Sequence, residues 1–239
     1  MRQVQYPLSN PAVAAGPIFA DVASSSGYQA SLSNYSWTHP GSTPLPQGGV
    51  VVTVGVFLTG TVTSVLYGGA AMVFVRADTN GLYRNEIWRL EGPQAGSQTV
   101  EVTLDASLTS IASAVTYFGV SQNLMVEAHN GANGSNSTPT ASVTTLTAQA
   151  WVASGLATAK TTDHSVYGLQ RERTDNTGAL GTGAISDQGP VKVPAATSMS
   201  WDATGIGESW AVGVISLAPF VATEPPRQAF VNFQDPGLL

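Results

Sequence analysis

Few residues of this 239-residue sequence could carry acid–base or metal chemistry, and they lie far apart. The three histidines are His39, His129 and His164, and none has a carboxylate or a second histidine at metal-site spacing. His164 follows Asp163, but adjacent residues of a strand point to opposite faces, so a shared ligand set is not expected. All three histidines are predicted to be ordinary surface or loop residues, and no metal is expected.

Hydrolytic chemistry also lacks its usual patterns. Serine is abundant, but no Gly-x-Ser-x-Gly nucleophile elbow occurs. Asp78, Glu86 and Glu91 flank predicted turns, where carboxylates are solvated or make local bonds. The segment from Asp78 to Gly81 starts like a calcium loop but lacks the terminal glutamate, and Gly178 to Gly183 has no helix after it to cradle a phosphate. The sequence contains no cysteine, which excludes thiolate chemistry and disulfides. We therefore expect no enzyme, no catalytic residue and no cofactor.

Aromatic side chains offer a different kind of site. Flat rings on an exposed face can stack on sugars, but large rings in a domain of this size more often lie in the core. We favour the core interpretation. The six rings in question are Tyr83, Trp88, Trp151, Tyr167, Trp201 and Trp210.

The composition restricts the choice of partners. Charged residues make up 10% of the chain, against about 25% in ordinary soluble domains. Nine basic residues are scattered among fifteen acidic ones, so a cluster able to bind nucleic-acid phosphates is not expected. No apolar run approaches the ~18 residues of a membrane span, and Pro7, Pro11 and Pro17 interrupt any signal peptide. The sequence predicts a protein made in the cytoplasm, without nucleic-acid or membrane partners.

Strands must position these side chains. Between Gly49 and Asp78, three β-branched apolar runs are separated by Thr59-Gly60 and Gly68-Gly69. This pattern predicts a three-stranded antiparallel meander, with a tight hairpin at the paired glycines. Residues 50–58 and 111–120 are apolar on both faces, which predicts two central strands.

Further strands are predicted along the rest of the chain, and no window shows a convincing helical period. Pro- and Gly-rich residues 40–49 and the polar residues 129–145 are predicted to be loops. Ten to twelve strands of this length predict an all-β fold, an antiparallel β-sandwich of the jelly-roll type, as a single domain over 19–219. The additional strands are expected at 18–22, 30–36, 86–90, 98–104, 146–152, 165–171, 183–187, 198–202 and 209–217.

Both ends of the chain are rich in proline and lack periodicity. Residues 1–18 and 220–239 are predicted to be extended arms that lie on another surface or on a neighbouring subunit. The alternative is a C-terminal tail packed on its own domain. The predicted assembly contacts are Tyr6, Pro7, Phe220, Phe230 and Phe233.

Seven segments follow one another in a distinctive order: Tyr35–His39, the VVVTVGVF strand, Val62–Met72, Asn85–Trp88, Gln98–Thr103, Val115–Gln122 and Glu208–Val214. Through these segments, residues 20–219 resemble a group of jelly-roll-like domains found in bacteriophage virion proteins, in tail, fibre or capsid-surface components, and in some bacterial surface proteins. The resemblance implies an accessory structural role and names no catalytic site.

These observations together predict a structural protein of a bacteriophage virion that decorates the capsid surface, in preference to the tail. Its expected partners are major capsid or tail proteins and further copies of itself. The alternative is a carbohydrate-binding or adhesin module that attaches to a host surface glycan through exposed rings. A glycan-cleaving enzyme would require two carboxylates within ~10 Å in one cleft.

Overall fold

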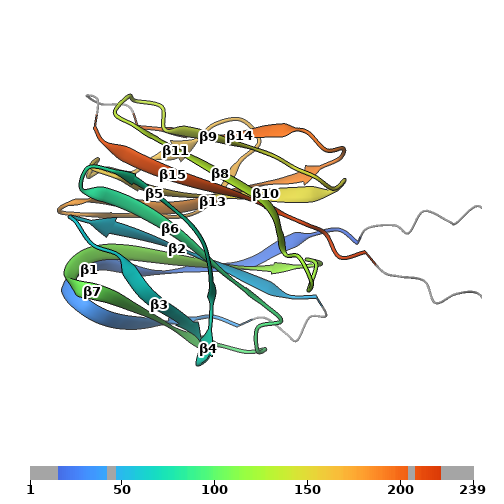
Figure 1. Cartoon of the computed structure of the whole chain (residues 1–239), viewed down its shortest axis with the longest axis horizontal. Coiled ribbons are helices and arrows are strands. Elements are labelled where there is room, and N and C mark those ends of the chain that lie inside the picture. Colours follow the sequence, from blue (N-terminus) through green and yellow to red (C-terminus); the bar gives the residue numbers. More distant parts are fainter. Residues whose placement is uncertain (1–15, 42–46, 204–207, 222–239) are drawn as a thin grey trace, which may run out of the picture.

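The computed structural model describes residues 16–41, 47–203 and 208–221 (Figure 1). All regular secondary structure within these ranges is β-strand, and every strand pair is antiparallel. The described residues include no helix of the length and apolarity that crossing a membrane requires. The strands form a seven-stranded, a five-stranded and a three-stranded sheet that pack face to face, which confirms the predicted antiparallel β-sandwich.

The N-terminal half of the chain forms one curved sheet. Its strand order is β4-β3-β7-β2-β6-β5, and β1 pairs with the other edge of β7 from Phe19, opposite Phe118, to His39, opposite Gln98. Its strands are β1 (Phe19–His39), β2 (Gly49–Phe57), β3 (Val62–Tyr67), β4 (Ala70–Ala71), β5 (Val73–Asn80), β6 (Tyr83–Glu91) and β7 (Gln98–Phe118).

The C-terminal half forms a second sheet and a small third one. The second sheet has the order β12-β13-β10-β15-β8, and the third has the order β11-β14-β9. The strands are β8 (Val126–Gly134), β9 (Thr140–Thr144), β10 (Ala150–Thr158), β11 (Ser165–Val166), β12 (Arg171–Gly178), β13 (Gly181–Val191), β14 (Ala196–Asp202) and β15 (Trp210–Leu217).

The two halves are built in the same order. The series β1-β7-β2-β6-β5 in the first half corresponds to β8-β15-β10-β13-β12 in the second. A bulge interrupts β5 between Phe74 and Arg76 opposite Ile87, and β12 between Glu172 and Thr174 opposite an isoleucine of β13. Contacts between the sheets repeat as well, because β7 touches β13 as β15 touches β6, and β1 touches β12 as β8 touches β5. An approximate two-fold axis between β2 and β10 therefore relates the halves.

Apolar side chains from both halves meet between the sheets in one shared core. Because burial of apolar area is the main driving force of folding, this core holds the two halves together. All nine residues of β2 are buried, which confirms it as a central strand. The shared core consists of Ile18, Val51, Ile87, Val115, Tyr117, Val120, Met125, Trp151, Ala153, Ile185, Ile215 and Leu217.

The predicted meander is wrong, although its hairpin is confirmed. Strand β2 lies between β6 and β7 rather than beside β3, because the long β7 pairs with both β2 and β3. Gly68 and Gly69 join β3 to β4, and both have positive φ, at 56° and 81°, as a tight turn demands.

Several strand boundaries also differ from the prediction. The strands predicted at 98–104 and 111–120 are one strand, β7, and those predicted at 18–22 and 30–36 are one strand, β1. The predicted loop at 129–145 is wrong, since it contains most of β8 and all of β9. Asparagine and glycine are residue types that favour turns, but in this segment they pair along β15. The described residues hold fifteen strands, whereas ten to twelve were predicted.

Candidate assembly surface at the chain ends

The first and last described residues meet at one end of the molecule. The Gly16 N–H donates to the Phe220 carbonyl oxygen at 2.9 Å, and the Phe220 N–H donates to the Gly119 carbonyl oxygen at 2.6 Å. Val120 and Pro219 form an antiparallel bridge beside them. We name residues 16–19, 118–125 and 218–221 the terminal junction. The first and last described residues thus lie side by side at one end of the sandwich (Figure 1).

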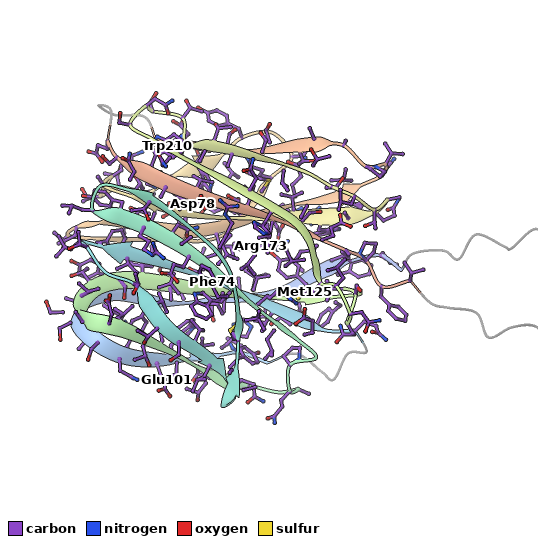
Figure 2. The ribbon with its side chains drawn as sticks, in the orientation of Figure 1. Phe74, Asp78, Glu101, Met125, Arg173 and Trp210 are labelled. Atoms are coloured by element: carbon purple, nitrogen blue, oxygen red, sulfur yellow. The ribbon has the colours of Figure 1, made fainter. Side chains whose placement is uncertain are left out.

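The junction is fixed by backbone geometry and by burial. Gly119 has φ +71°, and a Cβ atom there would collide with the carbonyl oxygen of Pro17, so this close crossing requires glycine. Ile18 is buried in the shared core and anchors the start of the described chain. Met125, labelled in Figure 2, is buried there too, and its carbonyl oxygen accepts the N–H of Ala218. The segments that follow the equivalent strands β7 and β15 thus pair with each other, which places the junction on the approximate two-fold axis.

Exposed apolar side chains surround this crossing. Phe19 is 56% exposed, Leu124 is 54% exposed and Val221 is 45% exposed, while Phe220 is half-buried. The Leu124 N–H donates to the hydroxyl of Ser121, whose own N–H donates to the Ala218 carbonyl oxygen, so this loop belongs to the crossing. Single exposed apolar residues are ordinary on protein surfaces, but a group of them around one point is typical of a protein-contact site.

Of the five predicted assembly contacts, only Phe220 lies within the described residues. It takes part in the terminal junction through both of its backbone groups. Tyr6, Pro7, Phe230 and Phe233 lie outside the described residues. Sequence reasoning missed Phe19, which was assigned to a strand of the sandwich, and Leu124, which only the pairing of distant segments brings to the chain ends.

His39 is buried, so its predicted surface position is wrong. Its Nδ1 lies 2.7 Å from the Ser24 hydroxyl, its Nε2 lies 2.7 Å from the Thr116 hydroxyl, and the Trp37 Nε1–H donates to Ser24. Burial lowers the pKa of His39 to about 4, mainly through desolvation of the charged form. A serine beside an imidazole is the arrangement of a nucleophile and its base, but here both ring nitrogens are taken by hydroxyls and the ring is a weak base. The cluster ties β1 to β7.

The other histidines differ from each other in burial. His129 is exposed on β8, as predicted, with Nδ1 3.1 Å from Arg76. His164 is buried, contrary to prediction, with Nδ1 3.7 Å from the Asp175 carboxylate, which also accepts its backbone N–H. Within the described part of the chain, no three metal-ligating side chains of His, Asp or Glu gather closely enough to hold an ion.

The acidic residues flagged in the sequence serve in ion pairs. Asp78 accepts two hydrogen bonds from Arg76, and Glu91 pairs with Arg89. Glu86 is buried rather than solvated, which corrects the prediction. Its carboxylate accepts hydrogen bonds from the Arg84 side chain, the Trp88 ring and a backbone amide of β3. The segment 78–81, expected to be a plain turn, is mostly strand: β5 continues to Asn80, and the turn to β6 begins only at Gly81, with φ +58°.

A buried ionic cluster between the sheets has no counterpart in the sequence-based predictions. The Asp187 carboxylate is fully buried, accepts two hydrogen bonds from Arg173 at 2.6 and 2.9 Å, and accepts one from the Tyr117 hydroxyl at 3.1 Å. Arg173 lies between the seven-stranded and the five-stranded sheet (Figure 2). Burial raises the pKa of both Asp187 and Tyr117. The cluster joins β7 of one half to β12 and β13 of the other.

The core interpretation holds for most of the six aromatic residues. Trp88, Trp151, Trp201 and Trp210 are buried, which confirms it for these four. Tyr167 is exposed in the loop before β12. The four buried rings are not available to stack on a sugar at the surface.

The terminal junction therefore combines both ends of the described chain with a group of exposed apolar side chains, and it is the candidate site that the geometry favours. No family model matches the chain, and comparison with curated proteins and with solved structures likewise gives no match.

Proposed function

We propose that this protein is an accessory structural component of a bacteriophage virion and that it attaches to the particle through the terminal junction. The observation that carries the proposal is the hydrogen-bonded crossing of Gly16, Gly119 and Phe220, which brings the first and last described residues together at one end of the sandwich. Beyond the terminal junction lie 15 residues at the N-terminal end and 18 at the C-terminal end.

The rigid body of the sandwich and the exposed apolar side chains of the terminal junction both favour attachment at this end of the molecule. The shared core and the antiparallel ladders hold the body as a unit, while the apolar group of Phe19, Leu124 and Val221 provides surface that gains free energy when a partner covers it. Two chain segments that start at the same point can contact one partner together, which raises the effective affinity of each.

Capsid decoration is favoured over a tail position. Two segments that leave one pole suit a part that is added to an existing lattice, because the rest of the sandwich remains free to face away from it. Major capsid or tail proteins are the proposed partners, and the low charged fraction of 10% favours apolar and hydrogen-bonded contacts over ionic ones.

Co-sedimentation with virions that lack this protein tests the proposal. The full chain is expected to bind. Removal of residues 222–239, or Leu124→Ser, should raise the dissociation constant about tenfold or more, which is the change expected when one leucine is no longer buried in the contact. Leu82→Ser is the matched control, because Leu82 is 47% exposed at the β5–β6 turn, away from the junction. Absence of binding by the full chain, together with its absence from purified virions, would contradict the proposal.

The carbohydrate-binding alternative has less support. Four of the six rings that could form its stacking face are buried. Binding on a glycan array that is lost in Tyr167→Ala would nevertheless favour it over the virion role, since Tyr167 is the exposed member of the set.

A further inference from the structure

The apolar side chains of the terminal junction have an identifiable ligand in the chain itself. We propose that the junction of one copy binds the aromatic segment 228–233 of a second copy, so that two copies associate pole to pole by exchanging their C-terminal segments. The inference deepens the proposed function, because it assigns a ligand to the same surface. The segment reads Gln-Ala-Phe-Val-Asn-Phe and includes Phe230 and Phe233.

The receptor is formed by Phe19, Leu124 and Val221, which are each about half exposed, and by the half-buried Phe220. These side chains come from three separate segments that the backbone hydrogen bonds of Gly16, Gly119 and Phe220 hold together. Aromatic rings that enter such a group bury much apolar area at low cost in side-chain entropy, which is why they act as anchors in interfaces.

Two features favour a second copy over the chain's own segment. The backbone of Phe220 is already paired on both sides, since its N–H donates to Gly119 and its carbonyl oxygen accepts from Gly16. For segment 228–233 to occupy its own junction, residues 222–227 would have to form a tight turn. The sequence Glu224-Pro225-Pro226 disfavours this turn, because proline restricts its own φ and the conformation of the preceding residue.

The length of the chain beyond the junction is sufficient. Eighteen residues follow Val221, and an extended chain covers about 3.3 Å per residue. Exchange in both directions gives an isologous interface on a two-fold axis, in which each copy provides one receptor and one ligand. It also adds the area that a stable interface needs, roughly 800 Å² per partner, which four side chains do not supply alone.

Engineered cysteines test the exchange directly, because the chain contains none of its own. A full-length chain with Leu124→Cys is mixed with one carrying Phe233→Cys under mild oxidation. The expected product is a disulfide-linked pair of one chain of each kind, seen on a non-reducing gel. Leu82→Cys replaces Leu124→Cys in the control, and the cross-link should then fall at least tenfold.

Sedimentation velocity gives an independent readout. The unmodified chain is expected to dimerise at micromolar concentration, and Phe230→Ser with Phe233→Ser should raise the dissociation constant at least tenfold, whereas Leu82→Ser should leave it unchanged. Circular dichroism of each variant confirms that it is folded.

Two results would overturn the inference. One is a monomeric full-length chain in which a combined Leu124→Cys and Phe233→Cys variant closes a disulfide within itself, since the segment would then occupy its own junction. The other is a dimer that neither set of substitutions affects. Particle binding is measured separately, so a monomer that still binds virions through its junction would refute the exchange and leave the proposed function standing.

Discussion

The two halves of the molecule share a strand order but differ in two respects. Their outer strands are continuous in one half and divided in the other, and the equivalent bulges carry an apolar side chain in one half and a charged one in the other. In the first half, β1 and β7 continue for 21 residues each and bend over the outer face of their own sheet. In the second half, the corresponding lengths are divided, β8 from β9 and β14 from β15, and the pieces form a separate small sheet. The strand order therefore survives whether or not a strand is continuous.

The equivalent bulges illustrate the chemical difference. The bulged residue of β5 is Val75, which packs against the shared core, whereas the bulged residue of β12 is Arg173, which binds Asp187. The residue that pairs with the first residue of β5 is Arg89, and the residue that pairs with the first residue of β12 is Asp187. A bulge re-aims one side chain while the ladder on either side is kept, so apolar and ionic solutions are both accommodated.

Asp187→Ala should give the largest effect of the substitutions that probe this difference. Removal of the carboxylate leaves the Arg173 guanidinium and the Tyr117 hydroxyl without their partner between the sheets, and breaking a buried pair costs about 3–5 kcal/mol. Urea unfolding measures the loss. Arg89→Ala at the equivalent position should cost less than about 1 kcal/mol, because the Arg89–Glu91 pair is partly exposed. Equal losses would contradict the conclusion that the ionic cluster of Asp187 is buried between the sheets whereas the equivalent Arg89 pair is partly exposed.

Acid should destabilise the first half through His39. The folded-state pKa is about 4, below the ordinary 6.5, so the unfolded chain binds the proton more readily between these values. Stability should therefore fall as the pH drops from 6.5 to 4, by about 3 kcal/mol in total at about 1.4 kcal/mol per pH unit, and this contribution should level off below pH 4. The measurement is the difference between the unfolding free energies of the unmodified chain and His39→Gln across this range. A difference that does not change with pH would refute it.

Gly155→Ala tests the face that the halves share. A Cβ atom there would lie 2.7 Å from Thr53 Cγ2 and 2.8 Å from the Asn85 amide oxygen, so β10 and β2 must separate. Overpacking of this kind costs about 1–3 kcal/mol. Gly55→Ala on β2 is the matched control, with its nearest contact at 3.3 Å from Ala157, and should cost less. Thermal unfolding of the two variants decides the order.

The smallest effect is expected at the two equivalent hairpin turns. Leu82 is 47% exposed and Leu180 is 38% exposed, so Leu82→Ser and Leu180→Ser should each change the unfolding free energy by less than about 0.5 kcal/mol. A marked loss in only one of them would show that the turns are not equivalent in packing.

Sequence patterns predicted the parts of this fold that local physics decides. Alternation and apolar runs identified β2 and the interior part of β7 as central strands, and Gly68-Gly69 identified a hairpin, because these features depend on adjacent residues. Pairing between strands that are distant in the sequence could not be predicted from these local patterns. The meander failed since nothing local shows that β2 and β3 each pair with a different stretch of the long β7 and not with each other. The repeated strand order is visible only in the pairing of the strands.

The candidate site was predictable to a smaller degree. Proline content and isolated aromatic residues drew attention to the ends, including Phe220, but the exposed Leu124 belongs to a loop in the middle of the chain. The burial of His39 and His164 was missed because the residues next to a histidine in the sequence do not show which hydroxyls or carboxylates will surround it after folding.

The approximate two-fold axis has a consequence for any particle that carries this protein. Since the axis passes through the terminal junction, a half turn about it exchanges the two halves of the molecule, which share a strand order. The exchange is imperfect at the junction itself, where Gly16 belongs to the amino end of the chain and Phe220 to the carboxyl end. A partner bound at this point would therefore meet a surface without two-fold symmetry, although the strands behind it are related by the approximate axis.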